Sequence, residues 1–119
     1  MAKYFTDGEF RKCIPSCSID DMDSDFLDIL DKIREDAGIP LKVNCAYRSV
    51  EWDKAKGRSG NSAHCSGVAV DVRCTNSANR HKIVKAAMDN GINRIGIADT
   101  FIHLDNSKTL PQGVIWLYD

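Results

Sequence analysis

The sequence has no segment that would carry the chain into or across a membrane. No apolar run approaches the about 20 residues that a membrane-spanning helix needs. The opening residues, MAKYFTDGEFRK, lack the apolar core of a signal peptide. We therefore expect the chain to be made and kept in the cytoplasm unless another component releases it.

A strong charge of one sign, internal repeats and linkers are also absent. The 16 basic and 17 acidic residues give a formal net charge of −1, which selects neither nucleic acid nor an anionic membrane as a partner. The 119 residues contain no repeat, no low-complexity tract and no linker. Residues 1–119 are therefore predicted to form a single domain around one core.

The five cysteines lack the paired CxxC spacing of a zinc finger. Cys13 and Cys17 form one CxxxC, which fits a disulfide or half of a soft-metal site. We favour reduced thiols that are mostly buried, because a cytosolic chain rarely keeps disulfides. Cys65, next to His64, is predicted to be a small, inward-packed residue.

Two segments have the apolar spacing of amphipathic helices. The first begins after a cap at Asp23 or Ser24 and ends before Gly38, and the second runs from about Asn79 to Asn90. Strands are predicted at about Leu41–Tyr47, Val68–Val72, Arg94–Ile97, Phe101–Leu104 and Val114–Leu117. Because the helices need not alternate with these strands, we predict an α+β fold, a small and mostly antiparallel sheet with two main helices packed on it.

The stretch Ser62–Asp71, SAHCSGVAVD, carries two side chains that can bind a metal. His64 and Asp71 would lie about 23 Å apart in an extended chain and about 10 Å apart along a helix axis. Both can hold one ion, at about 2 Å from each, only if the chain reverses between them. Gly67 is the residue that allows this reversal.

A catalytic zinc site needs a third protein ligand and an open position. Of the two other histidines, His81 lies between basic residues near the start of the second helix, where an exposed position is expected. His103 lies in TFIHLD, where strand alternation places it on the same side as Asp105. His103 is therefore the candidate third ligand, although spacing alone also leaves open a fold without a metal site.

Further motifs turn this pattern into a family resemblance. S-x-H-x-x-G-x-A-x-D is matched at every fixed position by Ser62, His64, Gly67, Ala69 and Asp71. The pattern resembles the signature of the zinc D-alanyl-D-alanine carboxypeptidase family. The wider group also holds lysostaphin-type peptidases, vancomycin-resistance dipeptidases, phage L-alanyl-D-glutamate endopeptidases and the hedgehog signalling domain. AYRS (Ala46–Ser49) resembles the arginine motif of the family, and RIGIADTFIHLD (Arg94–Asp105) resembles its closing zinc-histidine segment, so that the likeness covers roughly residues 40 to 119.

The resemblance implies a hedgehog-like fold with a zinc ion (Zn²⁺) in a cleft, held by His64, Asp71 and His103. The family usually supplies an acidic general base three positions before the last zinc histidine, where this sequence has Thr100. Asp99 and Asp105 are the two alternative bases. Asp105 is equally suited to support His103 from behind.

The resemblance also assigns residues that would contact the substrate. Arg48 resembles the family arginine that binds substrate and stabilises negative charge on the oxyanion, which a planar guanidinium does with two hydrogen bonds. Ser62 resembles the family serine near the substrate, or it only ties down its loop. Tyr47, Trp52 and Trp116 can line the cleft, although such aromatic residues more often belong to the core.

The predicted function is hydrolysis of peptidoglycan stem peptides by a zinc metallopeptidase, as a D-Ala-D-Ala carboxypeptidase or an L-Ala-D-Glu-type endopeptidase. We expect a monomer that binds peptidoglycan peptide, binds no nucleic acid and does not insert into a membrane. An endolysin-like phage protein that reaches the cell wall through a holin and a cytosolic dipeptidase both fit the sequence. The alternative is a zinc-stabilised, non-catalytic binding module of the same fold, which Thr100 supports.

Overall fold

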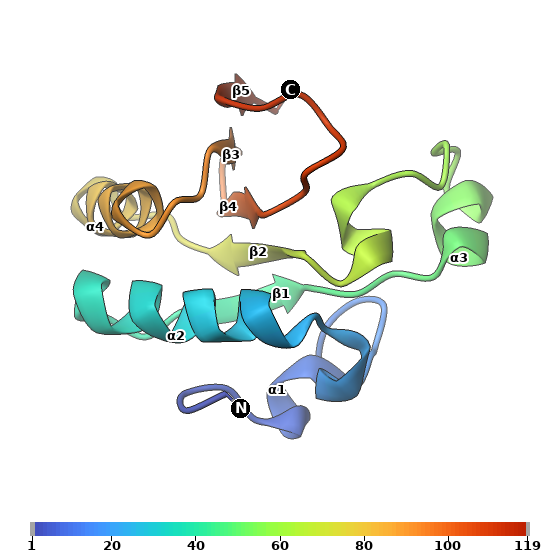
Figure 1. Cartoon of the computed structure of the whole chain (residues 1–119), viewed down its shortest axis with the longest axis horizontal. Coiled ribbons are helices and arrows are strands. Elements are labelled where there is room, and N and C mark those ends of the chain that lie inside the picture. The colour runs from blue at the N-terminus through green and yellow to red at the C-terminus, as the bar shows by residue number, and fades with distance from the viewer. Residues whose placement is uncertain (1, 119) are drawn as a thin grey trace.

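One five-stranded sheet forms the centre of the computed structural model, which describes residues 2–118. The strands lie in the order β1-β2-β4-β3-β5 (Figure 1). Their bounds are Lys42–Cys45 for β1, Ala69–Arg73 for β2, Arg94–Ile97 for β3, Phe101–Asp105 for β4 and Val114–Leu117 for β5. All neighbouring strands are antiparallel except β3 and β5, which are parallel. The predicted α+β fold with a mostly antiparallel sheet is confirmed.

The two long helices occur where the apolar spacing predicts them. Helix α2 (Ser24–Ala37) begins after Asp23, whose carboxylate accepts a hydrogen bond from the Phe26 N–H at 2.9 Å. It ends at Gly38, whose φ of 70° is left-handed. Helix α4 (Ser77–Asp89) begins two residues earlier than predicted, because the Asn76 side chain caps it.

Four shorter helical segments complete the structure: α1 (Asp7–Arg11), η1 (Ile19–Asp21), α3 (Val50–Ala55) and η2 (Ala63–Ser66), where η marks a 3-10 helix. Helices α3 and η2 were not predicted from the sequence. Both begin after a serine, since Ser49 accepts a hydrogen bond from the Trp52 N–H at 3.0 Å and Ser62 accepts one from the His64 N–H at 3.2 Å. No helix in the described part of the chain is long and apolar enough to cross a membrane.

The hydrophobic core lies between one face of the sheet and the two long helices. In Figure 1, α2 lies along β1 and α4 is seen nearly end-on. The strands contribute Val70, Val72, Ile95, Ile102 and Leu104, all fully buried. Helices α2 and α4 contribute Phe26, Leu30, Ile33, Ile83 and Ala87 to the same cluster. Because strand residues alternate between faces, the residues between these positions point to the opposite face of the sheet.

The five cysteines are all free thiols, as predicted. Cys13, Cys17, Cys45 and Cys74 are buried, and Cys65 is partly exposed. The core cluster includes Cys13, Cys17 and Cys74. Cys45 lies outside it, on the other face of the sheet.

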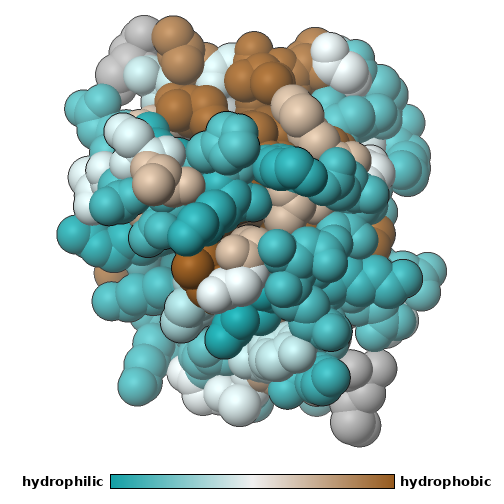
Figure 2. Space-filling view, turned by 90° about the vertical axis from the view of Figure 1, so that its left-hand side faces the viewer, coloured by the Kyte–Doolittle hydropathy of each residue, from teal (hydrophilic) through white to brown (hydrophobic). Residues whose placement is uncertain are grey.

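Exposed apolar side chains gather near the free edge of the sheet. Met88 of α4 is 49% exposed, and Ile115 and Leu117 of the edge strand β5 are 56% and 79% exposed. Figure 2 shows hydrophobic side chains concentrated at the top of the face it presents, the end of the molecule at which Figure 1 places β5. A shallow groove runs here between the end of α4 and β5, lined by residues including Met88, Ile92 and Ile115.

Candidate metal centre

A row of residues crosses the whole sheet on the face opposite the core, with one residue from each strand. Strand pairing places Cys45 opposite Asp71, Asp71 opposite His103, His103 opposite Gly96, and Gly96 opposite Trp116. Asp71 and His103 therefore sit side by side at the centre of this face. Their strand neighbours Val72 and Ile102 pair in the core, which explains why alternation places both polar side chains away from it.

Cys45 reaches this row because of an irregularity in β1. The register of β1 on β2 shifts between Val43 and Cys45, so that Val43 packs in the core while Cys45 faces Asp71. Cys45 was not among the site residues predicted from the sequence. Regular alternation would have placed it on the same face as Val43.

The turn formed by η2 and Gly67 brings His64 to the same face. Gly67 has a φ of 70°, and a Cβ there would lie 2.5 Å from the Asp21 carbonyl oxygen. The position thus requires glycine for two reasons, its left-handed backbone and the close approach of a neighbouring chain segment. The reversal predicted at Gly67 is present, and it leads directly into β2 and Asp71.

His64 and His103 converge on one carboxylate oxygen. Asp71 Oδ1 lies 3.4 Å from His64 Nε2 and 2.9 Å from His103 Nδ1. The two imidazole rings lie edge to face with their centroids 5.0 Å apart. All three side chains are buried or nearly so, with side-chain exposures of 3% for His64, 6% for His103 and 14% for Asp71. The structure thus brings together the three side chains predicted as metal ligands.

The other nitrogen of each ring is held by an acceptor. His64 Nδ1 lies 2.6 Å from the Ala46 carbonyl oxygen, which can only accept, so Nδ1 donates. His103 Nε2 lies 2.7 Å from Asp105 Oδ2 and donates to that carboxylate. These contacts leave His64 Nε2 and His103 Nδ1 as the two nitrogens that face Asp71. Such outer contacts are typical of histidines that bind a metal.

The pKa shifts in the cluster favour a charged Asp71 carboxylate and positive charge next to it. Burial raises the pKa of Asp71, but hydrogen bonds from His103 and His64 outweigh it, and the pKa lies well below its usual range. Burial lowers the pKa of both histidines, yet their carboxylate partners raise it further, and the net shift of each pKa is upward. A divalent cation bound here would place its positive charge beside the Asp71 carboxylate.

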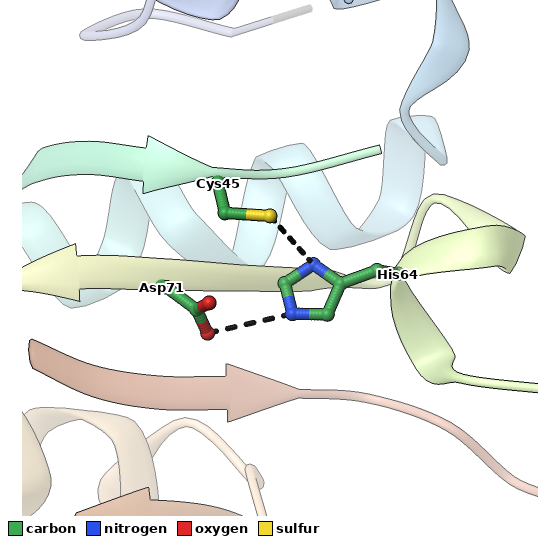
Figure 3. Close-up of side chains that lie close together, drawn as sticks. All are labelled: Cys45, His64 and Asp71. Atoms are coloured by element: carbon green, nitrogen blue, oxygen red, sulfur yellow. Dashed lines mark hydrogen bonds and ion pairs between the residues drawn. The ribbon is translucent and has the colours of Figure 1, made fainter. Parts of the chain in front are cut away.

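The donor set fits zinc, which takes imidazole nitrogen, carboxylate oxygen and thiolate ligands in tetrahedral sites. Cys45, His64 and Asp71 also form a group whose potential ligand atoms lie within 4.8 Å of one another (Figure 3). However, Cys45 Sγ approaches His64 at Nδ1, 3.8 Å away, on the edge of the ring that donates to Ala46. Figure 3 shows Asp71 at the opposite edge, by Nε2. The geometry therefore favours His64, Asp71 and His103 as the set that shares one ion.

Asp105 is completely buried, and its two oxygens are both engaged. Oδ2 accepts from His103, while Oδ1 accepts from Arg94 Nε at 2.8 Å and from the Ser107 N–H at 3.0 Å. Burial raises the pKa of Asp105, but these partners outweigh it and hold the pKa below its usual range. Arg94, its cross-strand partner in β3, was not predicted as a site residue. With its other oxygen held by Arg94 and Ser107, Asp105 is well placed to orient the His103 ring.

Asp99 and Thr100 lie in the turn between β3 and β4, and both are exposed. Neither lines the cleft described below. The backbone carbonyl of Asp99 accepts a hydrogen bond from Arg80, and that of Thr100 accepts one from the Cys74 N–H at 2.9 Å. The Asp99 side chain is therefore not among those that form the cleft.

The candidate metal ligands form the floor of a cleft of about 350 Å³. Three arginines line it: Arg48, Arg58 and Arg94. Phe101, Trp116 and Tyr118 provide an aromatic side, and the Trp116 ring centroid lies 5.3 Å from that of His103. Gly96 makes room for this side, because a Cβ there would lie 2.6 Å from Tyr118 and 2.7 Å from Trp116. The cleft thus has a cationic and an aromatic wall.

Arg48 lines the cleft, and three neighbouring side chains hold its guanidinium in place. Its Nη2 donates to Ser62 Oγ at 2.9 Å, its Nη1 lies 3.7 Å from Cys45 Sγ, and its Nε lies 3.2 Å from Asp53 Oδ1. Ser62 also lines the cleft, so it both caps η2 and holds Arg48. A guanidinium has five N–H groups, and two of them remain for a substrate.

The remaining predicted residues divide between the cleft and the rest of the surface. Trp116 lines the cleft, whereas Trp52 and Tyr47 are partly buried outside its lining. His81 is exposed on α4, as expected. Tyr118 and Arg58 were missed, because neither belongs to a motif whose spacing indicates a ligand or a catalytic group.

Comparison with known proteins assigns the family. No curated protein matches the chain. The family model described as Peptidase M15 matches residues 3–105, a range that includes all three candidate metal ligands. The chain therefore belongs to the Peptidase M15 family of zinc D-Ala-D-Ala carboxypeptidase-like enzymes.

Proposed function

We propose that this protein is a zinc metallopeptidase that hydrolyses peptidoglycan stem peptides, as a D-Ala-D-Ala carboxypeptidase or an L-Ala-D-Glu-type endopeptidase. Membership of the M15 family supports a zinc metallopeptidase-type function. The observation that carries the proposal is the convergence of His64 Nε2 and His103 Nδ1 on Asp71 Oδ1 at the floor of an open, arginine-lined cleft. The partner is the peptidoglycan peptide itself, and a monomer suffices because one chain forms the whole cleft.

Each side chain has a role that follows from its contacts. His64, Asp71 and His103 would hold the zinc ion, which would supply Lewis-acid activation of water and of the scissile carbonyl. Asp105 accepts a hydrogen bond from His103 Nε2, and this contact orients the ring so that Nδ1 faces Asp71. Arg48 is rigidly held with two free N–H groups, and it would bind the carbonyl oxygen of the substrate as negative charge develops there.

One observation favours the second candidate, a zinc-stabilised binding module without catalysis. Of the two acidic residues that flank His103 in sequence, Asp105 has both oxygens occupied, and Asp99 lies outside the cleft. A peptidase needs a group that accepts a proton from the attacking water. The two candidates share the metal site and differ only in turnover.

The test combines zinc content with cleavage of stem pentapeptide and of whole peptidoglycan, followed by mass spectrometry of the products. We expect one zinc per wild-type chain and release of D-Ala or a stem fragment. His64→Ala should lose both, whereas the exposed control His81→Ala should keep both. Bound zinc without cleavage of either substrate would favour the binding module, and absence of zinc would refute both candidates.

A further inference from the structure

Three cations surround the indole of Trp52 in the α3 region. The guanidinium carbons of Arg48 and Arg58 each lie 5.8 Å from its ring centroid, and the Lys56 ammonium lies 5.4 Å from it. Arg48 and Arg58 line the cleft, whereas Lys56 does not. Trp52 therefore supports two arginines at the cationic wall from behind.

The buried Asp53 carboxylate supplies the compensating charge. Asp53 is fully buried, and its Oδ1 lies 3.2 Å from Arg48 Nε and 3.9 Å from Arg58 Nε. Neither of its oxygens has a hydrogen bond within the described residues. A buried carboxylate is costly unless cations lie close to it, so Asp53 favours a position of both guanidiniums near α3.

The two arginines differ in how much of their hydrogen-bonding capacity is free. Arg48 is buried, and its guanidinium is engaged by Ser62, Cys45 and Asp53. The side chain of Arg58 is 49% exposed, and in the described part of the chain its guanidinium donates no hydrogen bond. Its backbone is held, since the Arg58 N–H donates to the Asp53 carbonyl oxygen at 3.1 Å. Arg58 thus presents an unoccupied planar fork at the edge of the cleft.

We propose that Arg58 determines specificity by binding a carboxylate of the substrate peptide beside the candidate metal centre. A planar guanidinium pairs with a carboxylate through two parallel hydrogen bonds. Among residues 2–118, the acidic side chains that line the cleft are the candidate ligand Asp71 and the engaged Asp105. Asp53 lies outside the cleft lining, with its Oδ1 3.9 Å from Arg58 Nε. The inference rests on the proposed function. A stem peptide with lysine at its third position offers two such groups, its C-terminal carboxylate and the free α-carboxylate of the γ-linked D-Glu.

Three forms of one stem pentapeptide distinguish these sources: the free acid, the C-terminal amide, and the peptide with D-isoglutamine in place of D-Glu. For each peptide, initial rates on the zinc-loaded protein give kcat and KM. Chemical-shift titration of the same protein gives a dissociation constant for any peptide that is not cleaved. Wild type, Arg58→Gln, Arg58→Lys and Lys56→Gln are compared, after thermal melting has shown that each variant is folded.

We expect wild type to bind the free acid about tenfold more tightly than one of the two amidated peptides, and the weaker peptide identifies the carboxylate. Arg58→Gln should remove this preference by weakening binding of the free acid alone. Arg58→Lys should keep part of it. Lys56→Gln, which removes a cation from Trp52 outside the cleft, should leave it unchanged.

The proposal is overturned if wild type binds all three peptides equally, or if the preference survives in Arg58→Gln. It is also overturned if Arg58→Gln weakens all three alike, or if Lys56→Gln has the same effect as Arg58→Gln. If wild type cleaves none of the peptides, the proposed function fails, but the dissociation constants still decide the role of Arg58.

Discussion

The two faces of the central sheet are built from the same strands but are stabilised in different ways. Residues of β4 alternate between the two faces. Ile102 and Leu104 are fully buried in the core, whereas His103 and Asp105 face the cleft. The core face is held by apolar burial, which is non-directional and roughly proportional to area. On the cleft face, Asp105 is equally buried, but each of its two oxygens has a specific hydrogen-bond partner.

This difference predicts which substitutions affect stability and which affect chemistry. Removing atoms from the core face leaves a cavity and lowers the free energy of unfolding. Removing a side chain from the cleft face leaves a donor or acceptor without its partner, or the metal without a ligand. Neighbouring residues on one strand should therefore give opposite kinds of defect.

The largest expected effect comes from His103→Ala on the cleft face. Loss of one of three ligands should abolish stoichiometric zinc binding and lower hydrolysis on the order of 10³-fold, the equivalent of several kcal/mol of Lewis-acid stabilisation. Added zinc should raise the Tm of wild type but not that of the variant, because zinc stabilises only a folded site that binds it. A variant that still binds one zinc and shows the same zinc-dependent rise in Tm would contradict the assignment of His103.

The adjacent substitution on the core face, Ile102→Ala, should lower the free energy of unfolding by about 2–5 kcal/mol. Ile102→Val should lower it by only about 0.5–1.5 kcal/mol. Urea unfolding of the metal-free proteins measures both. Each variant should still bind one zinc per folded chain, since Ile102 points away from the cluster. Loss of zinc binding by folded Ile102→Val would show that the two faces are not independent.

Sequence patterns captured the parts of the site that depend on strand alternation. Strand alternation predicted that Asp71 faces away from Val70 and Val72 and that His103 and Asp105 share a side, and the freedom of glycine predicted the reversal at Gly67. That Asp71 and His103 belong to one site was implied by the family resemblance, and the pairing of β2 with β4 places them side by side. The helices α3 and η2 were missed, because segments of six and four residues are too short to show helical periodicity.

Tertiary pairing explains the rest of what was missed. Cys45 faces Asp71 only through a register shift, which no local pattern encodes. Arg94 and Asp105 are 11 positions apart and meet only because β3 pairs with β4. The sequence left open whether Asp99 or Asp105 is the general base. The position of Asp99 depends on the path of the turn between β3 and β4, which the strand pattern does not determine.

Asp105→Asn should have an intermediate effect on the cleft face. It removes the charge that holds His103 Nε2, so zinc affinity should fall about 10–100-fold, as is typical when a partner of a metal-binding histidine is lost. Asp99→Asn is the matched control on the other side of His103 in sequence. Competition with a chelator of known affinity measures both. An equal loss in the two variants, or an effect of Asp99→Asn alone, would reverse the roles inferred for these carboxylates.

The smallest expected effect concerns the Cys13 thiol in the core. Burial raises the pKa of both Cys13 and Asp71, but only at Asp71 do hydrogen bonds outweigh it, so the net pKa shift is upward for Cys13 and downward for Asp71. Burial, together with nearby Cys17 and Cys45, raises the pKa of Cys13 to about 12. An unfolded thiol loses its proton near pH 8.5, whereas folded Cys13 keeps it, so this contribution to stability is present below about pH 8.5 and is lost as pH rises toward 12. Between pH 9 and 10.5, wild type should lose stability faster than Cys13→Ala by at most about 1.4 kcal/mol per pH unit. Urea unfolding under reducing conditions measures these slopes. Equal slopes would mean that Cys13 ionises as readily in the folded chain as in the unfolded one, and that burial on this side of the sheet does not keep the thiol neutral.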